Sequence, residues 1–211
     1  MKKSLLIMAP LLFGPLVFGG SLSAQQSPPA ELPGQADPAR VAGGTYALDK
    51  AHTQVSWQVN HFGFNDYFGL FGDITGTLSI DPANPSAAKV DIEIPITSVA
   101  TSSAGLTTHL KTADFFDAEK FPSARFVSTA VTVDGNLATI SGNLTMLGIT
   151  KPVVLETTFT GAGSNPFNKN ATIGFHAETV LKRSEWGMTK FVPLVGDEVY
   201  LRISAAFEKQ G

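Results

Sequence analysis

Residues 107–126 read TTHLKTADFFDAEKFPSARF, which joins a helical pattern directly to a strand pattern. Leu106 and Leu110 lie one helical turn apart and Phe115 follows them, so a short helix is predicted here. Pro122 then ends the helical pattern, and a strand is predicted to begin at Ser123. An amphipathic helix of this kind must bury its apolar face against another element. The rest of the chain has to supply that partner.

Most of the chain from Thr45 onward alternates apolar and polar residues with a period of two, as half-buried strands do. Val55, Trp57 and Val59 lie on one face of residues 53–61, with polar side chains on the other face. The same pattern predicts further strands over residues 73–81, 89–96, 124–133, 137–146, 152–161, 171–182 and 198–208. About eight antiparallel strands predict a sandwich or a closed barrel, and periodicity alone does not choose between them.

Two further segments complete an ordered set with residues 107–126. They are DKAHTQVSWQVNHFG at residues 49–63 and GNLTMLGITKPV at residues 142–153. Over residues 44–208 this set resembles the YceI-like family of exported, lipocalin-like isoprenoid-binding proteins. The resemblance implies an all-β fold, an extended antiparallel lipocalin-like β-barrel of about eight strands, with the short helical insert capping the barrel. It also implies a long apolar ligand, such as a polyisoprenoid or a quinone-type lipid, in the interior.

The helical insert departs from the family in one place. Family members commonly carry an Arg-Asp pair shortly before the His-Leu, whereas this chain has Leu106 and Thr107 there. His109 and Leu110 match the family, as does Pro122 further on. The resemblance therefore does not carry over a charged head-group role for that pair, and a less polar cap is expected.

The first 43 residues are predicted to lie outside the barrel. Residues 1–24 read as a cleaved signal peptide, with Lys2 and Lys3, an apolar run and a small-residue exit, and cleavage is expected between Ser23 and Gln26. Residues 25–43 are rich in Pro, Ala and Gln and are predicted to be a flexible spacer. Together with the resemblance, this predicts a periplasmic protein without stable membrane insertion.

Composition narrows the function further. The chain has no cysteine, so a single core over residues 44–208 must provide the stability without disulfides. Its net charge is −3, which argues against a nucleic-acid or anionic-membrane partner. Only 16% of residues are charged while 43% are hydrophobic, more than an ordinary surface and core require.

Several segments are candidates for ligand contact. Residues 62–72 place five aromatic residues among glycines, which fits a mobile aromatic flap at a cavity mouth or a bulged strand pair in the core. The segment at residues 183–190 could close the far end of the cavity, or it could be a turn whose tryptophan packs on the sheet. The predicted ligand-binding residues are Val55, Trp57, Val59, His61, Phe64, Phe68, Leu110, Phe115, Phe116, Phe126, Phe159, Phe175, Trp186 and Met188.

Catalytic and metal patterns are missing from the sequence. The four histidines, His52, His61, His109 and His176, form no close pair or short cluster. No Gly-x-Ser-x-Gly elbow or paired carboxylate in an apolar setting occurs. We therefore predict a binding protein rather than an enzyme, with no cofactor or metal, that sequesters or carries a long apolar ligand. A homodimer is a candidate oligomeric state. The alternative is a structural or stress-related periplasmic partner protein with a solid barrel core and no ligand.

Overall fold

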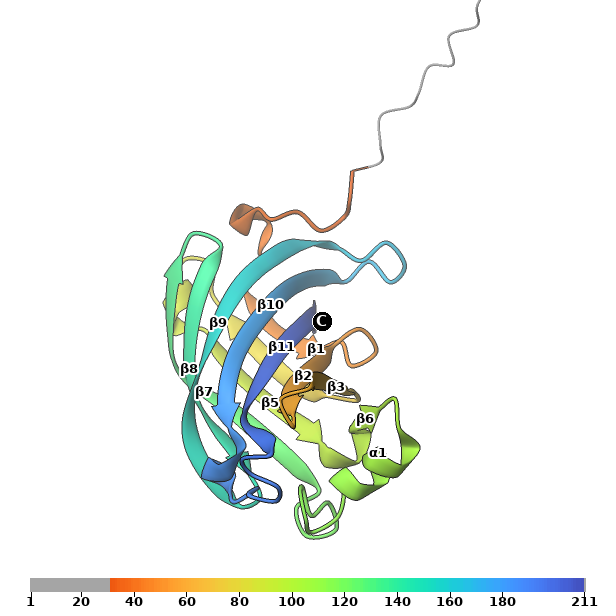
Figure 1. Ribbon diagram of the computed structural model, residues 1–211. Helices are drawn as coiled ribbons and strands as arrows, with labels where there is room; N and C mark the ends of the chain where they lie inside the picture. Colours follow the sequence, from red (N-terminus) through yellow and green to blue (C-terminus); the bar gives the residue numbers. More distant parts are fainter. Residues whose placement is uncertain (1–30, 211) are drawn as a thin grey trace, which may run out of the picture. The chain divides into compact units, whose positions relative to one another are not determined.

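The computed structural model describes residues 31–210, and residues 32–210 form one compact unit (Figure 1). The predicted signal peptide and its cleavage site lie outside the described residues. Eight antiparallel strands pair in a closed ring, in the order β1-β4-β5-β7-β8-β9-β10-β11 and back to β1. Their bounds are β1 Gly44–Leu48, β4 Thr75–Ile80, β5 Lys89–Pro95, β7 Ser123–Asp134, β8 Leu137–Met146, β9 Ile149–Ser164, β10 Ala171–Lys182 and β11 Val195–Lys209.

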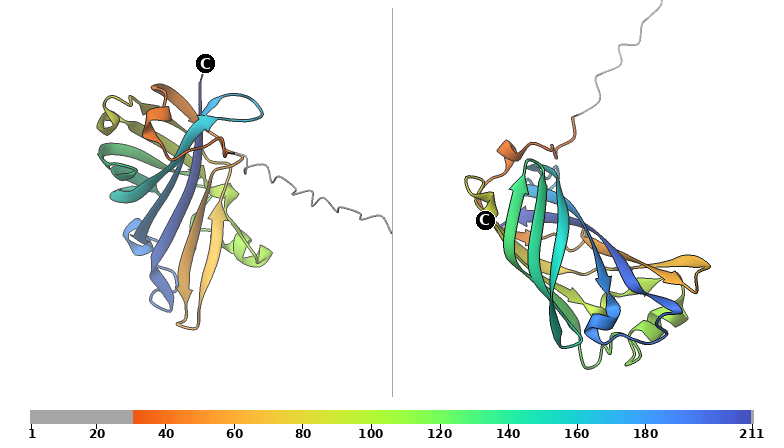
Figure 2. Two further views of the ribbon diagram at one scale, coloured as in Figure 1. Left: turned by 90° about the horizontal axis from the view of Figure 1, so that it is seen from above. Right: turned by 60° about the vertical axis from the view of Figure 1, so that its left-hand side comes forward.

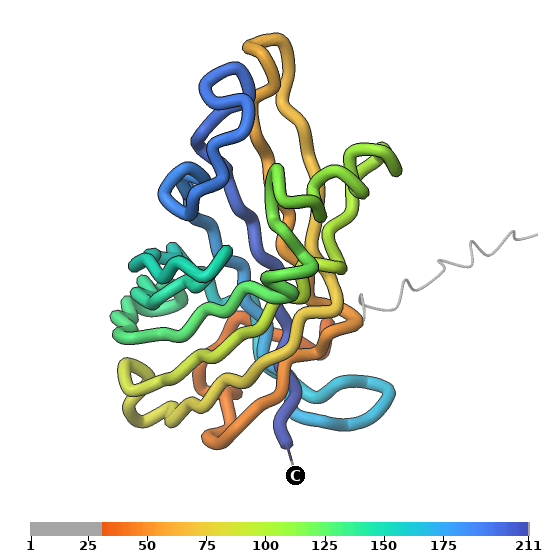
Figure 3. The backbone as a smooth tube through the Cα atoms, turned by 90° about the horizontal axis from the view of Figure 1, so that it is seen from below, coloured from red at the N-terminus to blue at the C-terminus, as the bar shows by residue number. Residues whose placement is uncertain are grey.

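A side branch leaves the ring at β11, because two strands share one edge of that long strand. β1 pairs with its last residues, with Leu48 opposite Phe207, and closes the barrel there. β2 (Gln54–His61) pairs with its earlier residues, from Ser204 back to Val195. β3 (Asn65–Phe71) and the two-residue β6 (Ala100–Thr101) continue from β2, so the sheet splays outward at this end of the barrel (Figures 2 and 3).

The helix in the insert is shorter than the helical sequence pattern, which continues to Phe115. Helix α1 covers Ala104–Leu110, and turns replace the helix over residues 111–117. Ser103 caps its first turn by accepting a hydrogen bond from the Leu106 backbone N–H at 3.3 Å. The turn after the helix folds back onto the end of the helix, where the Phe116 N–H donates to the Leu110 carbonyl at 3.0 Å. The helix lies against β6, at the splayed end of the sheet (Figure 1). Short 3₁₀ turns occur at Pro38–Arg40, Pro85–Ala87, Ile96–Ser98 and Arg183–Trp186.

Residues 32–43 lie along the barrel, whereas their composition predicts a flexible spacer. The backbone N–H of Gln35 donates to the Ala162 carbonyl at 3.1 Å, and the Ala162 N–H returns the bond at 2.9 Å. This contact is possible because β8 pairs with β9 only as far as Thr158, which leaves the end of β9 with an open edge. A glycine at 163 admits the approaching chain, since a Cβ there would overlap the Pro33 carbonyl.

The turn between β9 and β10 is anchored by a carboxylate on β11. Glu208 accepts hydrogen bonds from the side-chain amides of Asn165, Asn168 and Asn170 at 2.7–3.1 Å. These bonds, led by those from Asn168 and Asn170, hold the pKa of Glu208 below its ordinary value. The stabilisation is therefore complete above the unfolded pKa of about 4.3 and is lost as the pH falls through the folded value.

Glu208→Gln is accordingly expected to reduce the loss of folding stability that occurs as the pH falls. The effect should stay below about 1 kcal/mol, because the carboxylate is partly exposed. Thermal melts of the parent and the variant between pH 3 and pH 7 measure it. Parallel curves for the two proteins across this range would show that the three amides do not favour the charged form.

Candidate ligand-binding cavity

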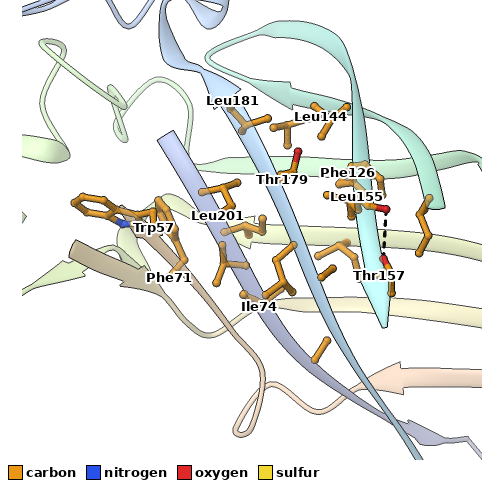
Figure 4. A pocket seen from close by; sticks show the side chains of 18 of the residues that line it. Trp57, Phe71, Ile74, Phe126, Leu144, Leu155, Thr157, Thr179, Leu181 and Leu201 are labelled. Carbon is orange, nitrogen blue, oxygen red and sulfur yellow. Dashed lines mark hydrogen bonds between the residues drawn. The ribbon is translucent and has the colours of Figure 1, made fainter. Parts of the chain in front are cut away.

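The barrel encloses an apolar cavity of about 940 Å³. Inward-facing side chains line it because alternate residues of each strand point to the same face. Val55 and Val59 from β2 and Leu201 and Ile203 from β11 are examples. Figure 4 shows this lining, with Trp57 and Phe71 at one end and Phe126, Leu144 and Leu155 on the facing wall. The volume falls in the range typical of small-molecule sites.

Eleven of the fourteen predicted ligand-binding residues line the cavity. They come from the inner faces of the strands, from α1 and its turn, and from the loop after β10. They are Val55, Trp57, Val59, His61, Leu110, Phe115, Phe116, Phe126, Phe159, Phe175 and Met188.

The other three predicted residues lie outside the lining. Phe64 is 88% exposed in the turn between β2 and β3, and Phe68 is 61% exposed on the outer face of β3. Trp186 is only 2% exposed, but its indole N–H donates to the Leu144 carbonyl at 3.2 Å and it packs beside the cavity. It belongs to the core that supports the wall.

The aromatic segment at residues 62–72 is a regular hairpin arm, which differs from both sequence-based interpretations. β3 pairs with β2 without a register shift, from Val55 opposite Phe71 to His61 opposite Asn65. The alternation therefore sends Tyr67 and Phe71 into the cavity and Phe68 outward. Sequence reasoning missed Tyr67 and Phe71, although strict alternation counted from Asn65 would have found both.

Two glycines let aromatic rings lie flat against the cavity wall. A Cβ at Gly69 would overlap the Trp57 indole, and a Cβ at Gly142 would overlap the Phe126 ring. The same Cβ at Gly142 would also lie 2.7 Å from the Val127 carbonyl oxygen. The glycines thus keep the rings out of the lumen and maintain its width.

Gly142→Ala is expected to destabilise the fold by roughly 1–3 kcal/mol, because the Phe126 ring must move into the cavity. In a Phe126→Ala background the same substitution should cost less, since only the backbone contact remains. Urea unfolding of the four proteins in this cycle measures the difference. Strictly additive effects would mean that Gly142 does not position the ring.

A buried arginine holds the loop after β10 at one end of the cavity. The Arg183 side chain donates from Nε to Gly196 O at 2.8 Å, from Nη1 to Met188 O at 2.8 Å, and from Nη2 to Val195 O at 2.9 Å. Burial lowers the pKa of Arg183, while the nearby Asp197 opposes this shift. The guanidinium therefore links the carbonyl of Met188, in the loop after β10, to the carbonyls of the first two residues of β11.

Charged groups near α1 are paired with one another. Asp114 Oδ2 lies 2.9 Å from His109 Nε2, and Asp114 Oδ1 lies 3.2 Å from Lys190 Nζ. Hydrogen bonds from His109 and then Lys190 lower the pKa of Asp114. The Phe115 ring, which stacks edge-on against His109, also approaches the Phe191 ring, with centroids 6.3 Å apart. This aromatic and charged cluster borders the cavity beside α1.

The remaining histidines are dispersed. His52 pairs with Asp49 at 2.6 Å, and His176 is exposed on β10. His61 lines the cavity, where its ring centroid lies 4.2 Å from that of Phe62. Within residues 31–210 no group of three or more His, Cys, Asp or Glu side chains is close enough to hold a metal ion. In the same range no helix has the length and apolar character needed to span a membrane.

An eight-stranded antiparallel barrel around an apolar lumen, with one short helix at its side, is a lipocalin-like barrel. The family model for the YceI-like domain matches residues 46–207. Protein YceI of Salmonella arizonae is 39% identical over 161 residues, which cover 75% of this chain and 84% of that protein. The chain therefore belongs to the YceI-like family.

Solved structures share the fold. Burkholderia cenocepacia BcnA matches with a TM-score of 0.65 at 24% identity, covering 75% of this chain and 98% of that one. A Campylobacter jejuni YceI protein matches with a TM-score of 0.62 at 30% identity, covering 78% and 97%. A polyisoprenoid binding domain from Saccharophagus degradans, implicated in plant cell wall breakdown, matches with a TM-score of 0.62 at 12% identity, covering 78% and 98%.

Proposed function

We propose that this protein is exported to the periplasm and sequesters or carries a long apolar lipid, a polyisoprenoid chain, inside its barrel. The observation that carries the proposal is the apolar lumen of about 940 Å³, lined by both hydrophobic clusters of the fold. A chain of isoprene units has no polar groups of its own, so it needs a continuous apolar wall. The name of the Saccharophagus degradans domain is consistent with this ligand class, although at 12% identity it shares the fold alone.

Burial of the chain would supply the affinity. At about 25 cal/mol per Å², covering ~400 Å² of ligand surface contributes roughly 10 kcal/mol before the costs of association. The strand walls are preformed, which reduces those costs. The mechanism needs no catalytic group, and the ligand leaves unchanged.

The alternative of a structural partner with a solid barrel core requires a filled interior. The described barrel instead keeps rings such as Trp57 and Phe126 flat against its wall, over Gly69 and Gly142. Residues that hold a lumen open favour a binding protein over a solid core.

Co-purified lipid is the direct test. The full chain is expressed with its natural N-terminus, purified from the periplasmic fraction, extracted with organic solvent and analysed by mass spectrometry. We expect a prenyl lipid in near-stoichiometric amount and an N-terminus that begins between residues 24 and 26. Intact Met1 in the membrane pellet would contradict export, and an extract without any long apolar lipid would contradict the ligand.

The two tryptophans should report on binding differently. Trp57 lines the cavity, whereas Trp186 is buried outside its lining with its N–H bonded to Leu144. A long polyprenol is therefore expected to change the fluorescence of Trp186→Phe and to leave that of Trp57→Phe nearly constant. A ligand response that survives Trp57→Phe and disappears in Trp186→Phe would place the ligand elsewhere.

A further inference from the structure

We infer that one end of the barrel docks on a lipid bilayer through an exposed apolar tip, so that the ligand passes between the bilayer and the lumen without crossing water. The tip consists of Phe62 and Phe64 in the turn between β2 and β3, and of Phe191 and Leu194 in the loop before β11. The inference rests on the proposed function, because it names the source from which the barrel takes its apolar lipid.

The two loops of the tip lie side by side, although they are far apart in the sequence. The Phe62 N–H donates to the Leu194 carbonyl at 2.8 Å and joins them. Figure 3 shows the β2–β3 turn and the loop before β11 projecting together from one end of the sheet. Phe64 is 88% exposed and Leu194 is 63% exposed, and the other two side chains are partly exposed. Contiguous exposed apolar side chains of this kind mark an interaction site.

The tip borders an opening of the cavity. Phe62 and Phe191 both line the lumen and are also partly exposed to solvent, so each ring faces both. Phe64 and Leu194 lie outside the lining and extend the apolar surface beyond the opening. A partner that covers the tip therefore also covers a route into the lumen.

The tip carries no fixed charge. Residues 61–65 and 191–196 contain no Asp, Glu, Lys or Arg. The neighbouring Lys190 is paired with Asp114, with Nζ 3.2 Å from Oδ1. Charged side chains are costly in the apolar part of a bilayer, whereas Phe and Leu side chains enter its headgroup and acyl boundary readily. The composition of both loops therefore suits a bilayer surface.

The backbone of the tip is largely satisfied by internal hydrogen bonds. Most of its amide donors bond to carbonyls of the same two loops, and one bonds to the Asn60 side chain. The donors are the N–H groups of Phe62, Gly63, Phe64, Val192 and Val195. Pro193 has no N–H to satisfy. Backbone that enters an apolar medium must be satisfied without water, and an exposed loop that stays in water has no such requirement.

A bilayer accounts for these features better than another protein does. A polyisoprenoid chain has no polar groups, so its source is a membrane and its transfer through water is disfavoured. A second copy of this chain could cover the apolar rings, but it would place two lumens against each other and supply no lipid. A bilayer covers the rings, matches the uncharged and internally bonded loops, and holds the ligand.

Vesicle flotation tests the docking directly. The purified protein is mixed with phosphatidylcholine vesicles, and the fraction that floats with the lipid is measured. We expect the parent to bind equally at ~0.05 M and ~0.5 M salt, because apolar burial rather than charge supplies the affinity. Phe64→Asp and Leu194→Asp should each lower the partition coefficient by at least about tenfold, since each removes apolar burial and adds a charge.

Phe167→Asp is the matched control and should float as the parent does. Phe167 is 93% exposed in the turn between β9 and β10. Glu208 ties that turn to the last residues of β11, whereas the tip adjoins Val195 at the start of β11. A parent that does not float, or three variants that all behave alike, would overturn the inference. A dimer that dissociates in Phe64→Asp, measured by sedimentation equilibrium, would do the same by assigning the tip to a second copy.

A transfer assay separates this inference from the proposed function. Vesicles that contain a polyprenol are mixed with delipidated protein, and Trp57 fluorescence in a Trp186→Phe background reports uptake. Phe64→Asp should slow uptake by about tenfold and leave the affinity for a short prenyl alcohol added in solution unchanged, because Phe64 does not line the lumen. Equal uptake rates in parent and variant would contradict the docking role. A parent that floats with vesicles but takes up no polyprenol would contradict the proposed function while the docking surface stands.

Discussion

Ala177→Phe is expected to weaken the binding of long chains strongly while short chains still bind. Ala177 lies in the middle of β10, is 7% exposed and lines the cavity. A phenyl ring there projects across the lumen, so a long ligand loses the part of the cavity beyond it. Loss of the corresponding burial weakens a long polyprenol by roughly 3 kcal/mol, or more than a hundredfold. A short prenyl alcohol that fits on one side should lose less than about threefold.

His176→Phe is the matched control, since His176 is the preceding residue on the same strand and is exposed on the outside of the barrel. It adds the same ring without entering the lumen and should bind every chain length as the parent does. Thermal melts of both variants confirm that the barrel is intact before binding is measured. A folded Ala177→Phe protein with parental affinity for long chains would mean that the ligand does not run through the barrel.

The inner faces of the strands could be predicted from the sequence because a half-buried strand marks its inward side by alternation. Alternation places Val55, Trp57 and Val59 on one face of their strand, and all three line the cavity. Closure of the ring could not be predicted from alternation, because a sandwich and a barrel place the same residues inward. The choice of a barrel came from the family resemblance, and the pairing of β1 with β11 agrees with it.

Phe64 and Phe68 show where composition misleads. A cluster of aromatic residues resembles a ligand contact, yet a strand sends alternate residues to opposite faces whatever their chemistry. The register of β3 on β2 decides which rings face inward, and it is set by the turn between the strands. That turn includes Phe62 at a φ of 58°, a conformation that the sequence pattern does not predict for phenylalanine.

Contacts between residues far apart in the sequence account for the other differences between the predictions and the structure. The spacer lies along the barrel because β9 extends beyond β8 and leaves an edge for Gln35. The sequence around Gln35 does not predict this unpaired edge of β9. Arg183 lies in the segment that the sequence predicts to be near the cavity, but the sequence does not predict its three carbonyl partners at Met188, Val195 and Gly196, because the fold brings them to it.

Arg183→Met is expected to cause the largest loss of stability among the substitutions considered. The side chain is 5% exposed, and its removal leaves three carbonyls without their donors. Unsatisfied buried carbonyls cost about 1–3 kcal/mol each, and partial relaxation of the loop reduces the sum. The free energy of unfolding should therefore fall by roughly 3–5 kcal/mol. For a domain of this size the melting temperature should fall by on the order of 10 °C.

Arg202→Met is the matched control, because Arg202 is exposed and pairs with Glu178 on the outer face at 3.0 Å. It removes the same charge and should change the unfolding free energy by less than about 1 kcal/mol. Arg183→Lys should fall between the two, since one ammonium group cannot reach three carbonyls in the planar arrangement that a guanidinium provides. Urea unfolding of the three variants gives the order. Equal stabilities for Arg183→Met and Arg202→Met would mean that the loop after β10 satisfies its carbonyls without Arg183.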